Sequence, residues 1–149
     1  MRAIIVDDER LARKELKSLL KDYHEIEIVD ECSSPDEAIK SIEKHNPDLL
    51  FLDIQMPEKT GFDLLQELDK TPKVIFVTAF DEYALKAFEV NALDYLMKPV
   101  DPDRLKETIT KYYPTRMKKM NLSKFQIEVY CLRMIKFSLK MEKNVGSFI

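Results

Sequence analysis

The chain has 149 residues, of which 45% are hydrophobic and 34% are charged, and its formal net charge is −3. A chain of this length can form one domain of about 100–150 residues with a short extension. Its apolar runs fall well short of the roughly 18 residues that span a membrane, which excludes a transmembrane role. Met1 leads directly into a short apolar strand, which is not the pattern of a signal peptide. We therefore expect a cytoplasmic protein.

The two cysteines, Cys32 and Cys131, lack the spacing of metal ligands. Since no export signal is recognised, the expected compartment is reducing, and thiols stay free there. We therefore expect two free thiols.

Charge is distributed unevenly along the chain. Residues 1–113 contain 16 Lys and Arg against 25 Asp and Glu, whereas residues 114–149 contain 8 against 2. This shift predicts a boundary near Pro114, between an acidic domain and a basic tail. A basic tail fits contact with an anion such as nucleic acid, but a short segment can also be basic without such a partner.

Hydrophobic patterning divides residues 1–113 into alternating strands and helices. Strands are predicted at 2–6, 26–32, 48–53, 73–79 and 94–99. Helices are predicted at 10–23, 35–45, 61–70, 81–90 and 103–113. Ser34 and Glu37 predict a capping box at the second helix, and Asp101 with Pro102 predicts the start of the last.

Five consecutive strand–helix units predict an α/β fold with a doubly wound, five-stranded parallel sheet. Several strands are apolar throughout, which is typical of strands covered by helices on both faces. In such sheets, ligands bind beyond the carboxyl ends of the strands, where the strand order reverses.

Polar side chains stand at these strand ends. Asp7 and Asp8 follow the first strand, and Asp53 follows the third. Thr78 ends the fourth strand, and Lys98 ends the fifth. Three converging carboxylates repel one another, and a divalent cation with oxygen ligands removes that penalty, so the sequence predicts a Mg²⁺ site.

Asp53 is the predicted nucleophile of this rim. A metal, an ammonium and a hydroxyl around one carboxylate are what an aspartate needs to receive a phosphoryl group. The metal and Lys98 can stabilise the charge that spreads over the phosphoryl oxygens in the transition state.

The set Asp7-Asp8, Asp53, Thr78-Ala79 and Lys98-Pro99 resembles the receiver domain of two-component response regulators. The resemblance covers residues 1–113 and implies the CheY-like, flavodoxin-like strand order 2-1-3-4-5. It implies that Asp53 is the phosphoacceptor. It further implies that Asp8 is the main acidic Mg²⁺ ligand, that Asp7 binds partly through water, and that the backbone carbonyl of Gln55 completes the protein ligands.

The same resemblance implies a conformational switch. Lys98 would contact the phosphoryl oxygens, Thr78 would supply the switch hydroxyl, and Tyr95 would be the aromatic side chain that turns inward on activation. Tyr95 also fits a tyrosine at the edge of the core. Gly61 fits the turn that opens the third helix, where a backbone without Cβ is useful.

Residues 76–100 are similar to receivers that precede LytTR-type or SARP-type DNA-binding domains. In those proteins a full output domain follows, whereas here only residues 114–149 remain. Two alternating segments, 125–131 and 135–141, predict strands that faintly resemble the start of a SARP-type domain. We expect a linker with the truncated start of an output domain, with a genuine short tail as the alternative. The apolar stripes of the two predicted strands must be covered by another surface. Pairing with a second copy of the chain is favoured over docking on the receiver.

Three functions fit these features. The first is a switch that controls transcription after a sensor histidine kinase phosphorylates Asp53. The second is a stand-alone receiver that acts by binding a protein or relaying phosphate. The third is a phosphatase of the haloacid dehalogenase type, but such enzymes place a second aspartate where Gln55 stands. We expect a protein that slowly hydrolyses its own aspartyl-phosphate and is not a dedicated enzyme.

The partners implied are the kinase and a second copy of the chain. The copy would bind through the face formed by the fourth helix, fifth strand and fifth helix, or through the tail. DNA is expected as a partner only where an output domain is present, and no membrane is expected.

Overall fold

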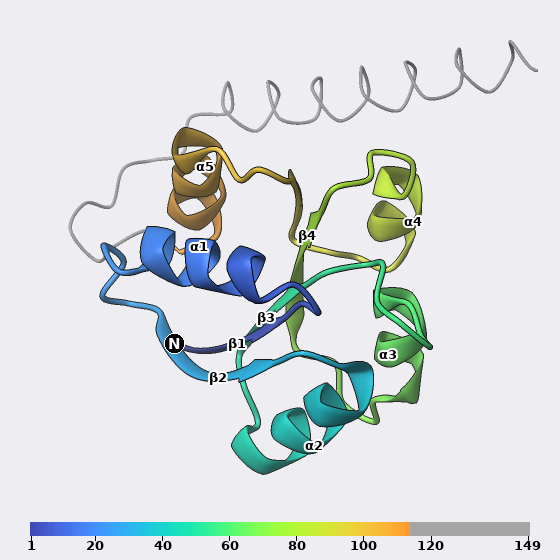
Figure 1. Cartoon of the computed structure of the whole chain (residues 1–149). Helices are drawn as coiled ribbons and strands as arrows, with labels where there is room; N and C mark the ends of the chain where they lie inside the picture. Colours follow the sequence, from blue (N-terminus) through green and yellow to red (C-terminus); the bar gives the residue numbers. More distant parts are fainter. Residues whose placement is uncertain (114–149) are drawn as a thin grey trace, which may run out of the picture. The chain divides into compact units, whose positions relative to one another are not determined.

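A computed structural model describes residues 1–113 of the chain (Figure 1). The predicted basic tail, 114–149, with its two predicted strands and Cys131, lies outside the described residues. Strands and helices alternate five times. The strands are β1 (Arg2–Val6), β2 (Glu27–Cys32), β3 (Leu49–Leu52), β4 (Lys73–Thr78) and β5 (Asp94–Met97). The helices are α1 (Arg10–Leu20), α2 (Pro35–His45), α3 (Gly61–Glu67), α4 (Ala84–Glu89) and α5 (Pro102–Tyr112).

The strands form one five-stranded sheet in the order β2-β1-β3-β4-β5, and every neighbouring pair is parallel. This order confirms the predicted α/β fold with the 2-1-3-4-5 sheet. The order reverses between β1 and β3, so the carboxyl ends of these two central strands flank the expected binding position.

Helices cover both faces of the sheet, which explains the fully apolar strands (Figure 1). On one face, Leu16 and Leu20 of α1 and Leu105 and Ile109 of α5 join a buried cluster with the strands. On the other face, residues of α2, α3 and α4 pack against the alternate strand positions. The adjacent strand residues Leu49 and Leu50 belong to opposite clusters, so neither face of β3 meets water.

Two helix starts differ from the predicted capping pattern. The Ser34 hydroxyl accepts from the Glu37 N–H as predicted, but the Glu37 carboxylate accepts from the Ser33 N–H, so the box at α2 does not close on Ser34. The reciprocal box forms instead at α3, between Thr60 and Asp63. At α5, Asp101 caps the helix as predicted, accepting from the Asp103 N–H.

Three helices are shorter than predicted. α1 ends at Leu20, and α3 ends at Glu67, where Leu68 takes up an extended backbone. α4 begins at Ala84, because residues 81–83 form a turn that precedes the helix. None of the helices in residues 1–113 is long and apolar enough to cross a membrane.

Gly61 is required by a close backbone approach. Its φ angle is not positive, so conformational freedom is not the reason. A Cβ atom built on Gly61 would lie 2.5 Å from the backbone oxygen of Asp53. The Gly61 N–H also donates to the carbonyl of Ile54 at 2.7 Å. A residue without Cβ therefore lets α3 start directly against the loop that carries Asp53.

Candidate functional site

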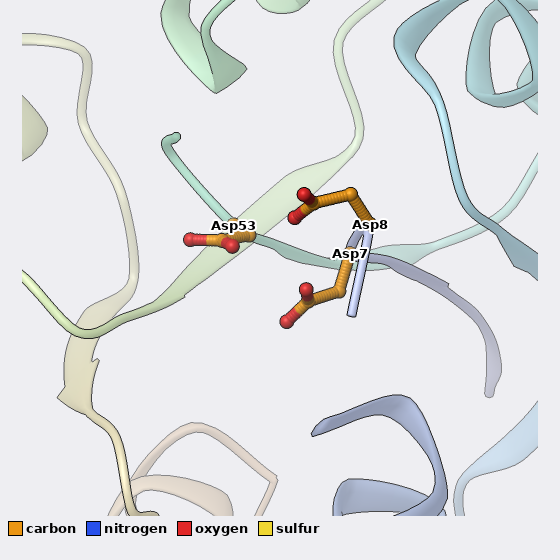
Figure 2. A group of neighbouring side chains, drawn as sticks. All are labelled: Asp7, Asp8 and Asp53. Carbon is orange, nitrogen blue, oxygen red and sulfur yellow. The ribbon is translucent and has the colours of Figure 1, made fainter. Parts of the chain in front are cut away.

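Three aspartates gather at the carboxyl end of the sheet, as predicted. One carboxylate oxygen of each of Asp7, Asp8 and Asp53 lies within 4.8 Å of the others. Figure 2 shows their side chains reaching into the same space beyond the ends of β1 and β3. Asp7 and Asp53 are 5% and 4% exposed, whereas Asp8 is exposed. The arrangement joins two buried carboxylates to one that water can reach.

The backbone holds the buried pair in register. The Asp53 N–H donates to the carbonyl of Val6 at 2.9 Å, which continues the β1–β3 ladder by one residue. The Asp7 N–H donates to the carbonyl of Cys32 at 3.0 Å, at the end of β2. Because both aspartates extend parallel neighbouring strands, the sheet itself sets their separation.

Lys98 provides the cation of the site. Its Nζ atom lies 2.7 Å from an oxygen of Asp7 and 3.1 Å from an oxygen of Asp53. The Lys98 N–H donates to the carbonyl of Thr78 at 2.8 Å, which ties the end of β5 to the end of β4. The peptide bond from Lys98 to Pro99 is cis. One ammonium thus bridges two strand ends that are 45 residues or more away in the chain.

Burial and charge perturb both partners of this cluster. Burial raises the pKa of Asp53 to about 6, with a further contribution from the Asp7 charge and an opposing one from Lys98. Burial alone would lower the pKa of Lys98, but its hydrogen bond to Asp7 and the charges of both carboxylates outweigh that cost and raise it. Asp53 therefore carries a negative charge at neutral pH that the protein holds at a cost.

The donor set fits a hard divalent cation. The site presents carboxylate oxygens only, which suit Mg²⁺ better than a softer metal. Three carboxylates share one lysine, so negative charge is in excess. Asp7, Asp8 and Asp53 are the side chains that would hold the ion, with the Gln55 carbonyl as the additional ligand that the resemblance predicts.

The remaining predicted residues lie around the rim with other partners. The Thr78 side chain is fully buried, and its hydroxyl accepts from the Phe80 N–H at 3.4 Å. The Tyr95 hydroxyl donates to the Phe80 carbonyl, and its half-buried ring packs near Phe76. The exposed Gln55 side chain donates to the Tyr83 hydroxyl at 3.0 Å. Thr78 and Tyr95 thus meet on the backbone of Phe80, which sequence reasoning missed.

Arg13 is a second residue that sequence reasoning missed. Its guanidinium donates to the backbone carbonyl of Asp7 at 2.7 Å. The only signal in the sequence is a cation at the end of the first turn of the helix that follows the two aspartates, and helix periodicity alone treats it as a surface residue.

Residues 3–110 match the family model for the response regulator receiver domain. The chain belongs to this family. It is 48% identical over 121 residues to the transcriptional regulatory protein BtsR of Escherichia coli, covering 80% of this chain and 51% of that protein. It is 49% identical over 126 residues to an uncharacterised response regulatory protein of Yersinia pestis, covering 83% of this chain and 53% of that protein. The chain thus spans about half the length of these curated relatives.

A solved structure supports the same assignment. The response regulatory domain of protein mrkE from Klebsiella pneumoniae aligns with a TM-score of 0.68 at 34% identity, covering 74% of this chain and 93% of that one. The receiver assignment from the sequence is therefore confirmed. The LytTR-type or SARP-type subgroup is not established by these comparisons and stays a prediction.

The cost of charging Asp53 predicts a pH-dependent gain in stability for Asp53→Asn in metal-free buffer. A carboxyl whose pKa is higher in the folded chain than in the unfolded one lowers the free energy of unfolding as pH rises from about 4 to about 6. Removing the charge should stabilise the chain at neutral pH by about 3 kcal/mol and have little effect near pH 4. Urea unfolding with EDTA at both pH values measures this. The exposed Asp69→Asn is the control, and an equal gain at both pH values would contradict the prediction.

The carboxylate cluster also predicts stabilisation by Mg²⁺. An ion that binds the folded chain alone raises the unfolding temperature, and it should relieve the repulsion among Asp7, Asp8 and Asp53. Asp8→Asn should weaken Mg²⁺ binding and reduce the thermal shift, because Asp8 brings the accessible carboxylate. Thermal melts over a Mg²⁺ titration test this, with Asp69→Asn as control. An unchanged Mg²⁺ affinity in Asp8→Asn would place the ligand elsewhere.

Proposed function

We propose that the chain is the phosphorylation-controlled switch of a response regulator that governs transcription. The observation that carries the proposal is the ammonium of Lys98 between Asp7 and Asp53, beside the accessible Asp8. The phosphoryl donor is the phosphohistidine of a sensor histidine kinase. The family assignment and the transcriptional regulatory relative BtsR support this reading.

Asp53 acts as the nucleophile. One carboxylate oxygen forms a bond to phosphorus while the bond from phosphorus to the donor nitrogen breaks. The backbone N–H of Ile54 donates to Oδ1 at 2.8 Å and Lys98 engages Oδ2, so the carboxylate is oriented before the donor arrives. The ammonium is also close enough to stabilise the oxygens of the transferred group.

Mg²⁺ held by Asp7, Asp8, Asp53 and the Gln55 carbonyl would add positive charge at the phosphoryl oxygens when bound. The chain's own part is to keep these oxygen ligands together. Asp7 and Asp53 are fixed by the sheet and by Lys98, whereas Asp8 is exposed at the edge where an ion enters.

The signal leaves the site through the loop between β4 and α4. Thr78 and Tyr95 hold the N–H and the carbonyl of Phe80 respectively. A phosphoryl group that attracts the Thr78 hydroxyl would release the Phe80 N–H and change the loop that Tyr95 also binds. Phosphorylation would thereby bias the surface that follows, as a local electrostatic change that shifts a two-state element.

This surface is suited to self-association. The outer side of α4 and β5 exposes large apolar side chains: Leu85 at 50%, Phe88 at 63%, Val90 at 42% and Met97 at 40%. We propose that the active receiver forms a homodimer through the α4-β5-α5 face.

Transcription control is favoured over a stand-alone receiver because BtsR is a transcriptional regulator, and footprinting on promoter DNA separates the two. Slow hydrolysis of the aspartyl-phosphate resets the switch, with no dedicated enzymatic role.

Phosphorylation is the direct test of the site. Incubation with acetyl phosphate and Mg²⁺ should add one phosphoryl group to the chain, measured by intact mass. Asp53→Asn should show no gain, because the nucleophile is absent, and EDTA should suppress the gain in the unaltered chain. A full gain in Asp53→Asn, or in EDTA, would contradict the assignment, and Asp69→Asn controls for the loss of one charge.

The dimer is tested with beryllofluoride as a mimic of the phosphoryl group. Light scattering should show a rise in mass with beryllofluoride and Mg²⁺ at micromolar concentration. Phe88→Ser should abolish that rise, whereas Leu11→Ser should not, because Leu11 is equally apolar and 78% exposed but lies on α1, which is not part of that face. A mass that stays unchanged by the mimic, or equal losses in both variants, would count against this face.

A further inference from the structure

Each polar group of Asp7, in its backbone and its side chain, has a partner. Its N–H donates to Cys32, one carboxylate oxygen accepts from the Glu9 N–H at 2.9 Å, and the other meets Lys98. Its backbone carbonyl lies beyond the last residue of β1, where the strand ladder gives it no partner. Arg13 supplies that partner, through Nη1 at 2.7 Å.

The Arg13 guanidinium is fixed at its other side. Its Nε atom lies 3.6 Å from an oxygen of Glu31 on β2, and the Arg13 side chain is only 15% exposed. Glu31 also accepts from Lys17, one helical turn further along α1, at 2.8 Å. The guanidinium presents several N–H donors in a rigid plane, so it can hold a carboxylate and a carbonyl at once in a fixed geometry.

The position of the Asp7 carbonyl affects the orientation of the neighbouring Asp8. It belongs to the planar peptide unit that joins Asp7 to Asp8, in which both Cα atoms and the carbonyl oxygen lie in one plane. Pinning this oxygen therefore fixes the rotation of the plane, and with it the direction in which the Asp8 side chain leaves the backbone. Lys98 does not fix the orientation of this peptide plane, because it contacts the Asp7 side chain and not its backbone carbonyl.

We propose that Arg13 is a positioning residue of the phosphorylation site, which aligns Asp8 with Asp7 and Asp53 by holding the peptide between the two aspartates. The inference rests on the proposed function, since it assigns these carboxylates to Mg²⁺. Arg13 touches neither the acceptor nor the expected ligand oxygens. It acts through the backbone, as residues behind metal ligands commonly do, and loss of such contacts typically weakens metal binding by about 10–100-fold.

A purely structural role would look different. An ion pair that only attaches α1 to β2 would contribute to stability without changing Mg²⁺ affinity selectively. Lys17 provides the matched control, because it lies on the same helix, carries the same charge and contacts the other oxygen of the same Glu31 carboxylate. A purely structural role predicts that replacing Arg13 and replacing Lys17 change the Mg²⁺ affinity equally.

The experiment compares Arg13→Met, Lys17→Met and Arg13→Lys in the full chain. Methionine keeps most of the apolar stem and removes the donors, and lysine restores one donor. Isothermal titration with Mg²⁺ should show affinity reduced by about tenfold in Arg13→Met, partly recovered in Arg13→Lys and within about twofold of the unaltered chain in Lys17→Met. Thermal melts in EDTA should differ little between the two methionine variants.

The outcomes separate this inference from the proposed function. Equal Mg²⁺ affinities in Arg13→Met and Lys17→Met overturn the positioning role, even if Asp53 is phosphorylated. A selective loss in Arg13→Met supports it, even if Asp53 proves not to accept a phosphoryl group. Absence of Mg²⁺ binding in the unaltered chain overturns both. If Arg13→Met does not fold, Arg13→Lys decides: an affinity equal to that of Lys17→Met overturns the role, and an intermediate loss supports it.

Discussion

The buried ionic cluster of Lys98, Asp7 and Asp53 is the interaction on which the site depends. Two carboxylates that are about one-twentieth exposed would repel each other strongly in a low-dielectric environment. One ammonium at hydrogen-bond distance from both makes their burial tolerable, but it leaves an excess of negative charge. A bound divalent cation would neutralise that excess of negative charge.

The fold makes this cluster possible by geometry. A parallel sheet directs the carboxyl ends of its strands to one edge, and the reversal of strand order opens a space there. The residues immediately behind the aspartates are fully buried strand residues, such as Val6 and Leu52, so the strand ends cannot move independently of the core. The close start of α3 at Gly61 restrains the same loop from the other side.

At the rim, one contact is weaker than those of this centre. Thr78 and Tyr95 share the backbone of Phe80, with the hydroxyl of Thr78 on the N–H at 3.4 Å and the hydroxyl of Tyr95 on the carbonyl. Breaking the long Thr78 hydrogen bond costs little, because bonds near this length are at the weak end of the range. The centre is thus held on several sides, and the Thr78–Phe80 hydrogen bond is the contact of the rim that is most easily broken.

The sequence by itself determined the order of elements, the parallel sheet and the rim residues Asp7, Asp53 and Lys98. These follow from local information, because apolar runs bury both of their faces and a polar residue that directly follows such a strand must lie at its end. Only the folded structure showed which serine the Glu37 carboxylate binds and which roles Phe80 and Arg13 have. Those features depend on contacts between residues brought together only by packing, and no periodicity along the chain encodes which backbone group a distant or outward-facing side chain will reach.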